Sequence, residues 1–237
     1  MPKRILVIIP VLNEVKNINP IVKKLKKNNK FDVLFIDDNS KDGTVQNILK
    51  EKKKYKRIFL IRRPKKLGIG SAHKDGLKWG YKKKYSIIIT MDCDGTHNPI
   101  YINRMVKLLS SQKIGLVSTN RFLQKNSLND WSVWRKKLTT LRHYVIKLLL
   151  NIEFDSSGAF RCYDTKKIKL KDILIAKNDS YSFFWESIFI LSKKYEIREI
   201  PIKLPGRLSG SSKMRLIDIF SAIIYLLKIF IKKKLFI

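Results

Sequence analysis

Short apolar segments alternate with longer amphipathic segments along the first half of the chain. The apolar segments carry hydrophobic residues on both faces, which is typical of strands buried in a parallel sheet. The lysine-rich segments between them have the periodicity of helices that cover such a sheet. The predicted strands are 5–10, 32–38, 57–63, 86–92 and 114–121, and the predicted helices are 17–28, 44–54, 71–84 and 100–111. The pattern therefore predicts an α/β fold with a mostly parallel sheet.

The second half of the chain has a less regular pattern. It contains no internal repeat and no linker-like stretch, so residues 1–215 are expected to form one domain. In order, we predict a polar loop (122–134), an amphipathic helix (138–152), a turn-rich return to the site (155–164), a helix (180–195), a strand (197–204) and a loop of small residues and cations (206–214).

Residues 216–237 predict a separate, basic amphipathic helix. Asp218 and Lys228 interrupt its apolar residues, and a spanning helix needs about 20 of them. We therefore expect a helix in the lipid headgroup layer, with Lys232–Lys234 against anionic lipid. The alternatives are a helix packed on the domain and a short, tilted span.

Three polar clusters follow predicted strands: PVLNE (10–14), DDNSKDGT (37–44) and MDCDGT (91–96). In open parallel sheets, ligands bind beyond the carboxyl ends of the strands. The three clusters are therefore expected to meet at one ligand site.

Asp92 and Asp94 are the candidate metal ligands. In an extended chain, residues i and i+2 project to the same side, so both carboxylates can reach one hard cation such as Mg²⁺ or Mn²⁺. Taken alone, two aspartates with this spacing lie more often in a solvated turn than at a metal site. Asp37 and Asp38 strengthen the case, because they end a neighbouring strand and can accept hydrogen bonds from a base or ribose.

Several neighbouring polar residues have two interpretations. Asp42 or Ser40 can cap the helix from Thr44, and Glu14 can support a helix start or contact a nucleotide. GIGSA (68–72) is a poor match to a dinucleotide-binding loop. We interpret it as a loop entering a helix, with Lys65 or Lys66 near phosphate and His73 at the surface.

The chain has a formal net charge of +32, from 51 Lys and Arg against 19 Asp and Glu. Such a charge attracts polyanions, either nucleic acid or an anionic membrane face, although biased codon usage would also produce it. The cations are spread along the chain, which argues against a nucleic-acid-binding protein. The two cysteines form neither a disulfide framework nor a zinc motif and fit a reducing compartment.

An ordered set of motifs resembles a known family. VIIPVLNE, IDDNSKDGT, RRPKKLGIGSAHKDG, MDCDGTHNP, STNRF, DSSGAFRCYD, FFWES, EIPIKLPGR and GSSKM are similar, in this order, to motifs of family-2 inverting glycosyltransferases. They look most like those of the polyprenyl-phosphate (dolichyl-phosphate) mannose synthases. The resemblance covers residues 4–215.

The resemblance implies a GT-A fold that transfers a hexose, with mannose from GDP-mannose as the first expectation, to a polyprenyl phosphate with inversion. It implies a peripheral protein on the cytoplasmic face of a membrane, with an anchoring partner subunit left open. By the same likeness, Asp94, Arg121, Arg135 and Arg207 would act in catalysis, and Asp92 and Asp94 would hold Mg²⁺ or Mn²⁺. The acceptor phosphate would meet Arg121, Arg135 and Thr139. The nucleotide sugar would meet Pro10, Asn13, Glu14, Asp37, Asp38, Lys66, Gly68, Asp92, Arg207 and Lys213.

Two departures from the family pattern bear on the donor. Thr96 stands where a better third metal ligand is common, and Leu12 stands where an aromatic residue is common. Because of these departures, the resemblance does not fix the sugar or the base of the donor, and a UDP-hexose donor is an alternative.

The acceptor class has its own alternative. A phosphate monoester is mostly dianionic at neutral pH, with a second pKa of about 6, so it needs arginines more than a general base. This predicts no essential catalytic histidine. A saccharide hydroxyl acceptor would need a base, for which Glu186 is the candidate; otherwise Glu186 is expected to pair with a lysine on a helix face.

Overall fold

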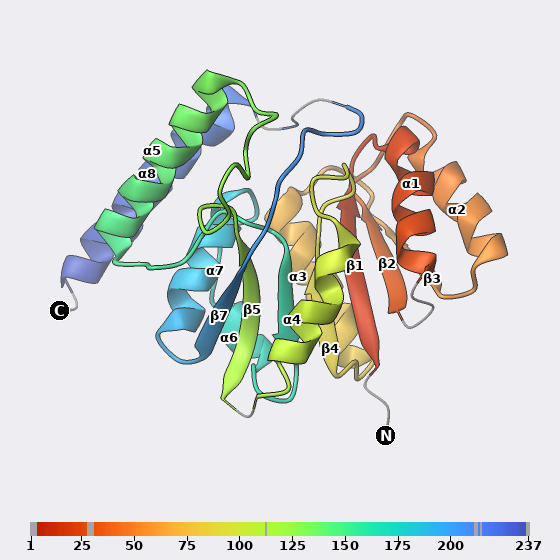
Figure 1. Ribbon diagram of the computed structural model, residues 1–237, viewed down its shortest axis with the longest axis horizontal. Coiled ribbons are helices and arrows are strands. Elements are labelled where there is room, and N and C mark those ends of the chain that lie inside the picture. The colour runs from red at the N-terminus through yellow and green to blue at the C-terminus, as the bar shows by residue number, and fades with distance from the viewer. Residues whose placement is uncertain (1–3, 28–30, 112, 211–212, 214, 236–237) are drawn as a thin grey trace.

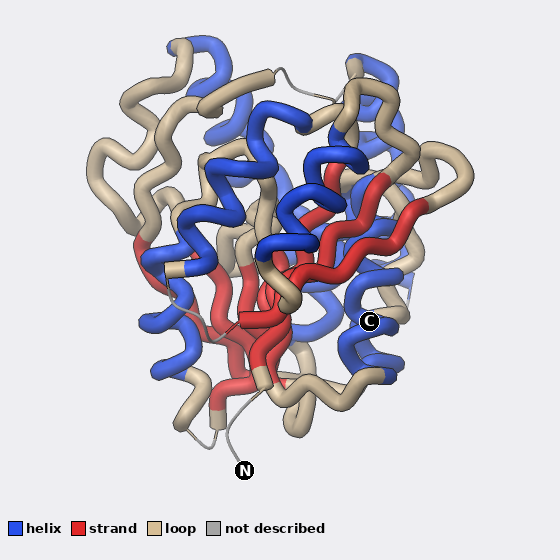
Figure 2. Tube along the Cα trace, turned by 90° about the vertical axis from the view of Figure 1, so that its right-hand side faces the viewer, coloured by secondary structure: helices blue, strands red, loops and turns tan. Residues whose placement is uncertain are grey.

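The computed structural model confirms the α/β fold, with one seven-stranded sheet between two layers of helices. It describes residues 4–27, 31–111, 113–210, 213 and 215–235. Figure 1 shows the sheet with α1 and α2 at one end and the α5–α8 pair at the other, and Figure 2 shows helices on both sides of the strands.

The sheet has the strand order β3-β2-β1-β4-β6-β5-β7. Among the described strands, only β6 runs antiparallel to its two neighbours. Because β5 pairs with β6 and β6 with β4, β5 runs in the same direction as β4. The carboxyl ends of all the other strands therefore lie at one edge of the sheet, together with the start of β6.

The elements have the following bounds. The strands are β1 (Ile5–Val11), β2 (Phe31–Asp37), β3 (Ile58–Arg62), β4 (Ile87–Thr90), β5 (Ile114–Asn120), β6 (Arg161–Asp164) and β7 (Glu196–Pro201). The helices are α1 (Val15–Lys26), α2 (Thr44–Lys54), α3 (Ile69–Lys82), η1 (Pro99–Tyr101), α4 (Ile102–Leu108), α5 (Val133–Leu150), α6 (Leu170–Ile173), α7 (Ser182–Ser192) and α8 (Leu216–Leu235).

Two hydrophobic cores lie on the two faces of the sheet. Successive side chains of a strand point to opposite faces, so β1 sends Val7 and Ile9 into one core and Leu6 and Ile8 into the other. Helices α1, α2 and α4 cover the first face, whereas α3, α6 and α7 cover the second. Strands covered in this way read as continuous apolar runs, which is why the first half of the chain was predictable.

The turn-rich interpretation of 155–164 misses strand β6. The strand carries Arg161, which is buried with 1% of its surface exposed, so its pattern is not apolar. The Arg161 guanidinium makes four hydrogen bonds, since it donates to the carbonyls of Ser156, Gly158 and Phe184 and to the Ser187 hydroxyl. A buried cation is tolerated where each donor finds an acceptor.

The prediction that His73 lies at the surface is wrong. His73 is buried on the inner face of α3, with its ring 5.2 Å from that of Phe184. Burial lowers the pKa of His73 to about 3, so it is neutral. The inner face of α3 is marked by glycines and not by large apolar residues, because Gly76 and Gly80 let side chains of the sheet approach closely. For this reason the sequence of α3 does not show the apolar periodicity that would have marked His73 as buried.

Helix α8 packs against the domain. Leu226 is buried between α5 and α7, in a cluster with Ile146 and Ile188, and Tyr225 lies 5.6 Å from the Trp185 ring. The C-terminal helix therefore does pack on the domain, which was one of the predicted alternatives. In the described part of the chain, no helix combines the length and apolar character needed to cross a bilayer.

Candidate active site

The polar clusters predicted to meet do lie at one edge of the sheet. Asp37 is the last residue of β2, Asp92 and Asp94 follow β4, and Arg121 follows β5. The register pairs Val11 at the end of β1 with Asp37. Because these strand ends point the same way, carboxylates and arginines share one edge.

Asp94 is the buried carboxylate of the turn after β4, with 7% of its surface exposed. Its Oδ1 accepts hydrogen bonds from the Thr96 amide (3.1 Å) and hydroxyl (2.7 Å), and its Oδ2 lies 2.8 Å from Arg207 Nε. Thr96 thus holds Asp94 in place. From the sequence, Thr96 was considered only as a weak metal ligand, so this role was missed. Asp94 already lies against a cation, because Arg207 reaches the turn after β4.

Asp92 is the more open member of the pair, with 34% of its side chain exposed. Its backbone amide donates to His97 Nδ1 at 2.9 Å. Burial and the neighbouring Asp94 raise the pKa of Asp92, while His97 opposes them. The two carboxylates repel each other, and a shared cation would relieve that repulsion.

A strap of residues 205–210 carries Arg207 to the carboxylates. The Leu208 amide donates to the Asp94 carbonyl at 3.0 Å. Gly95 has a φ of +85°, and a Cβ there would lie 2.5 Å from the Leu208 side chain. Only glycine combines this backbone conformation with so close a neighbour, so Gly95 seats the strap on the turn.

The strap continues toward the loop after β1. Asn17 donates from its side chain to the Ser209 carbonyl (3.3 Å), and Lys213 Nζ donates to the Asn13 carbonyl (3.3 Å). Figure 1 shows this segment crossing above the sheet before it reaches α8. Lys213 and Asn13 are therefore brought together, although they are far apart in sequence.

The loops after β1 and β2 are tied to each other. Asn13, with a φ of +54°, accepts from the Lys41 amide and donates from its own amide to Ser40. Asp42 accepts from the amides of Thr44 and Val15. These bonds fix one wall of the site. The N-cap of α2 is Gly43, without a side-chain cap hydrogen bond, so the interpretation of Asp42 or Ser40 as the cap is wrong.

Glu14 is half-buried beside this wall. It accepts a hydrogen bond from the Asn17 side chain at 2.5 Å. Burial raises the pKa of Glu14, with Asn17 and Lys213 opposing. Pro10 lies within β1 opposite Ile36, at the end of the same wall.

Asp38 organises the loop that precedes α3. Its carboxylate accepts from the Leu67 amide (2.7 Å) and the Gly68 amide (3.1 Å), and pairs with Arg63 at 2.7 Å. Gly68, with a φ of +99°, lies directly against the backbone of Asp179. Asp37 accepts from the Ser40 amide, whereas Lys66 is exposed beside this loop. Arg63 is a site-forming residue that the sequence reading did not single out.

The arginines expected at the acceptor are held differently. Arg121 is buried, and its Nε lies 2.7 Å from Asp155 Oδ2. Arg135 stacks on the Trp131 ring, with its guanidinium carbon 3.6 Å from the ring centroid, and Arg121 lies 6.0 Å from the same ring. Trp131 thus stands between the two arginines. Thr139 is buried one turn after Arg135 on α5.

Two other arginines act on Arg135 electrostatically. Burial, Arg207 and Arg121 lower the pKa of Arg135, whereas Asp94 opposes them. Burial alone would raise the pKa of Asp155, but Arg121 brings it below its usual value. Three cations in one place, with one of them neutralised by Asp155 and another by Asp94, form a site for an additional anion.

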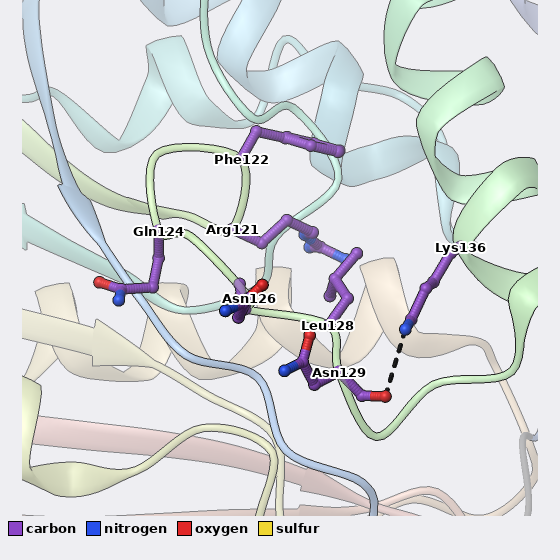
Figure 3. A pocket seen from close by; sticks show the side chains of 8 residues that line it. Arg121, Phe122, Gln124, Asn126, Leu128, Asn129 and Lys136 are labelled. Atoms are coloured by element: carbon purple, nitrogen blue, oxygen red, sulfur yellow. Dashed lines mark hydrogen bonds between the residues drawn. The ribbon is translucent and has the colours of Figure 1, made fainter.

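A cavity of about 240 Å³ opens beside Arg121, beneath the loop before α5. Figure 3 shows Arg121 and Lys136 on its walls, with Lys136 Nζ donating to the Asn129 carbonyl at 3.2 Å. Ser132 caps α5 by accepting from the Arg135 amide, so the helix begins inside the stretch predicted as loop. The loop and helix together place cations around an open space.

Glu186 lies buried on α7, and no lysine side chain among the described residues pairs with its carboxylate. Its carboxylate accepts from the amides of Lys177 (3.0 Å) and Asn178 (2.9 Å) and from the Tyr225 hydroxyl (2.8 Å). The predicted lysine pairing is therefore wrong. A carboxylate with these three donors holds the 177–178 loop and α8, and is poorly placed to act as a general base.

The donor set at the turn fits a hard divalent cation that takes further ligands from substrate. Two carboxylates one residue apart supply oxygen, and Mg²⁺ and Mn²⁺ are commonly held by one or two carboxylates plus phosphate oxygens. Within the described residues, no group of three or more His, Cys, Asp or Glu could hold a metal without such substrate oxygens. Asp92 and Asp94 would therefore hold the cation together with a diphosphate.

Besides Arg63, four residues that shape the site escaped the sequence reading. His97 was visible in the motif MDCDGTHNP, but nothing marked it as a partner of the Asp92 amide. Trp131 and Asp155 act through contacts with Arg121 that no spacing predicts. Glu199 carried a signal, because an acidic residue inside a predicted strand is unusual.

Comparisons with known proteins agree with this geometry. The chain is 26% identical over 89% of its length to the undecaprenyl-phosphate mannosyltransferase of Micrococcus luteus, covering 87% of that protein. It is 27% identical over 90% of its length to the polyprenol monophosphomannose synthase of Mycolicibacterium smegmatis, covering 81% of that protein.

Solved structures show the same fold at low identity. The mannosyltransferase PcManGT of Pyrobaculum calidifontis, in complex with GDP-Man and Mn²⁺, superposes with a TM-score of 0.60 at 15% identity. That match covers 90% of this chain and 59% of PcManGT. S. aureus TarS 1–349 gives a TM-score of 0.56 at 13% identity, covering 94% of this chain and 64% of TarS 1–349.

The family is shown by the sequence itself. Residues 6–169 match the family described as "Glycosyl transferase family 2", which is more than half of the chain and includes the carboxylate pair and Arg121. The chain therefore belongs to glycosyl transferase family 2.

Proposed function

We propose that this enzyme transfers mannose from GDP-mannose to a polyprenyl phosphate, with inversion at the anomeric carbon. The observation that carries the proposal is the cluster of Arg121, Arg135 and Arg207 next to the Asp92–Asp94 pair. A cation-binding pair beside an anion-binding cluster suits two phosphorylated substrates. The names of both curated relatives, which combine mannose with a polyprenyl phosphate, support the same pairing.

The donor occupies the carboxylate side in this proposal. Asp92 and Asp94 would hold a divalent cation, Mg²⁺ or Mn²⁺, which when bound offsets charge on the diphosphate leaving group. Mn²⁺ accompanies GDP-Man in the PcManGT structure. Arg207 adds a second positive charge, and Asp37, Asp38 and Glu14 face the nucleoside. Pro10, Asn13, Gly68, Lys66 and Lys213 line the same side.

The acceptor occupies the arginine side. Arg121 and Arg135 orient its phosphate, and Thr139 adds a hydroxyl. A phosphate oxygen attacks the anomeric carbon opposite the leaving group. A new C–O bond forms while the bond between the anomeric carbon and the β-phosphate oxygen breaks. GDP leaves with the electron pair of that bond. No proton needs to be removed, because the phosphate monoester is mostly dianionic. This agrees with a Glu186 carboxylate that is engaged elsewhere.

The direct test is incubation of the purified protein with labelled GDP-mannose, polyprenyl phosphate and Mn²⁺ or Mg²⁺. We expect a labelled product that extracts into organic solvent, and none with unphosphorylated polyprenol. Labelled UDP-glucose in a parallel arm tests the donor. Absence of lipid label with every donor would show that the acceptor assignment is wrong.

We also propose that the protein binds peripherally to the cytoplasmic face of a membrane, through α5 and α8. These helices lie side by side (Figure 1) and expose large apolar residues, with Leu148 82% and Ile224 69% exposed. Lys228 and Lys232 are exposed on α8 and suit anionic lipid, while the side chains of Lys233 and Lys234 lie outside the described residues. Residues 216–237 would then be the membrane-facing unit of the chain.

Flotation with liposomes tests this surface. We expect binding to vesicles that contain anionic lipid, and weaker binding of Phe220→Glu and Ile224→Glu. Glu substitution of Leu49, an exposed apolar residue on α2, is the matched control. Equal flotation of all variants would contradict the assignment.

A further inference from the structure

Glu199 lies near the end of β7, and both of its carboxylate oxygens accept hydrogen bonds. Oε2 accepts from the Asn120 side chain at 2.7 Å, and Oε1 accepts from the Asp155 amide at 2.8 Å. The two partners come from different segments, the end of β5 and the loop before β6. Glu199 therefore joins three parts of the chain at the edge where the substrates are proposed to bind.

Both partners of Glu199 act on Arg121. Asp155 Oδ2 accepts from Arg121 Nε at 2.7 Å and from the Arg121 amide at 3.3 Å. Asn120 precedes Arg121, and its Oδ1 accepts from the amides of Phe122 (2.7 Å) and Leu123 (3.3 Å). The side chain of Arg121 is thus fixed through one partner, and the backbone on either side of it through the other.

We propose that Glu199 is a positioning residue that holds the Arg121 guanidinium in place for the acceptor phosphate, through Asp155 and Asn120. The inference rests on the proposed function, because it assigns the phosphate to Arg121. Glu199 contacts neither substrate in this assignment.

The role requires an ionised carboxylate. Two N–H donors point at Glu199, and only a group with two acceptor oxygens satisfies both. A glutamine presents an NH₂ group to one of these donors, and a protonated glutamate also converts one oxygen to a donor. Either change leaves a polar group without a partner, which a half-buried site does not tolerate well.

The environment of Glu199 places its ionisation near neutral pH. Burial raises the pKa of Glu199 to about 7, with the Asp155 charge adding to the shift and the hydrogen bonds from Asn120 and Asp155, and Arg161, opposing it. Arg121 faces the same group only through Asp155. As pH rises through about 7, Glu199 ionises and accepts both hydrogen bonds, so use of the acceptor should improve over that range.

The test compares Glu199→Gln with the wild type from pH 6 to 8.5, at saturating GDP-mannose and Mn²⁺ and varied polyprenyl phosphate. We expect kcat/KM for the acceptor to fall roughly 10- to 100-fold at pH 8, the range for a misplaced substrate-binding group. The rise through about pH 7 should disappear, whereas a limb near pH 6 from the acceptor's own ionisation should persist. Glu196→Gln, on the same strand, should behave as wild type.

Two further readouts separate positioning from general structural damage. GDP-mannose affinity should be unchanged in Glu199→Gln; an equal loss of donor affinity would overturn the positioning role. If Glu199→Gln does not fold, Glu199→Asp, which keeps the charge, should retain the rise near pH 7 with a higher acceptor KM. A flat profile would overturn the inference.

The two proposals fail in different ways. If the wild type labels no lipid, the proposed function fails and this inference with it. If the wild type transfers mannose and Glu199→Gln matches it at every pH, only the role of Glu199 is wrong.

Discussion

The two sides of the site are built in different ways. On the proposed donor side, carboxylates follow the central strands β1, β2 and β4, and backbone amides of nearby loops donate to Asp37 and Asp38. On the acceptor side, Arg121 and Arg135 depend on side chains that come from distant segments, namely Asp155 and Trp131. The donor side is thus shaped by strand ends, and the acceptor side by pairs of side chains. We therefore expect that Arg121 and Arg135 can be replaced without loss of donor binding.

Asp94→Asn should have the largest effect on transfer. It removes one of the two proposed metal ligands and the negative charge that faces Arg207. A cation on the leaving group contributes several kcal/mol, so mannosyl transfer should fall by ~10³-fold. The measurement is initial rate at saturating Mn²⁺, with Glu153→Gln, an exposed carboxylate, as control. A loss of less than tenfold would remove Asp94 from the proposed metal site.

Arg135→Ala should reduce acceptor use by roughly 10²-fold in kcat/KM, because loss of a charged contact to an anion costs a few kcal/mol. Donor affinity, measured by thermal shift with GDP-mannose, should not change. Lys137→Ala on the same helix is the control. A matching loss of donor affinity would show that the two sides are not separable.

Gly95→Ala tests the contact between the strap and the turn after β4. The positive φ and the Leu208 contact should cost about 1–3 kcal/mol of unfolding free energy. Because Arg207 lies next to Leu208, transfer should fall as well. Gly206→Ala, where a Cβ would lie 3.7 Å from Asp130, should be close to neutral in a denaturant titration. Equal stability of both variants would show that the strap tolerates a side chain at Gly95.

Tyr225→Phe should have the smallest effect. It removes one of three donors to Glu186 and should cost about 1 kcal/mol of unfolding free energy. Thermal unfolding without lipid measures this, with the exposed Tyr144→Phe as control. Transfer should be almost unchanged if Glu186 is a structural group. Complete loss of transfer would instead indicate a catalytic role.

The donor side was largely predictable from sequence, because residues at the ends of apolar runs must share one edge of a parallel sheet. Asp37, Asp92 and Asp94 meet there for that reason. Arg121 was carried over by resemblance, and it lies at the same edge because it follows β5. Arg207 and Lys213 were carried over by resemblance, and the strap brings both to this edge.

The remaining features depend on contacts that a linear pattern does not contain. Asp155 is 34 residues from Arg121, and their pairing follows from the antiparallel strand β6, which the pattern missed. The burial of His73 was hidden because glycines mark the inner face of α3. Glu186 was assigned a lysine because its helix was treated alone, whereas its partners come from the 177–178 loop and α8.

The hydrogen bond between Tyr225 and Glu186 has a practical consequence for anyone who wishes to work without lipid. Deleting α8 to obtain a more tractable enzyme would remove a donor from a buried carboxylate and strip Leu226 from the cluster on α5 and α7. Lost activity in such a deletion would report damaged folding as well as lost lipid contact. Single charge substitutions at exposed positions of α8 leave that hydrogen bond in place and give the cleaner experiment.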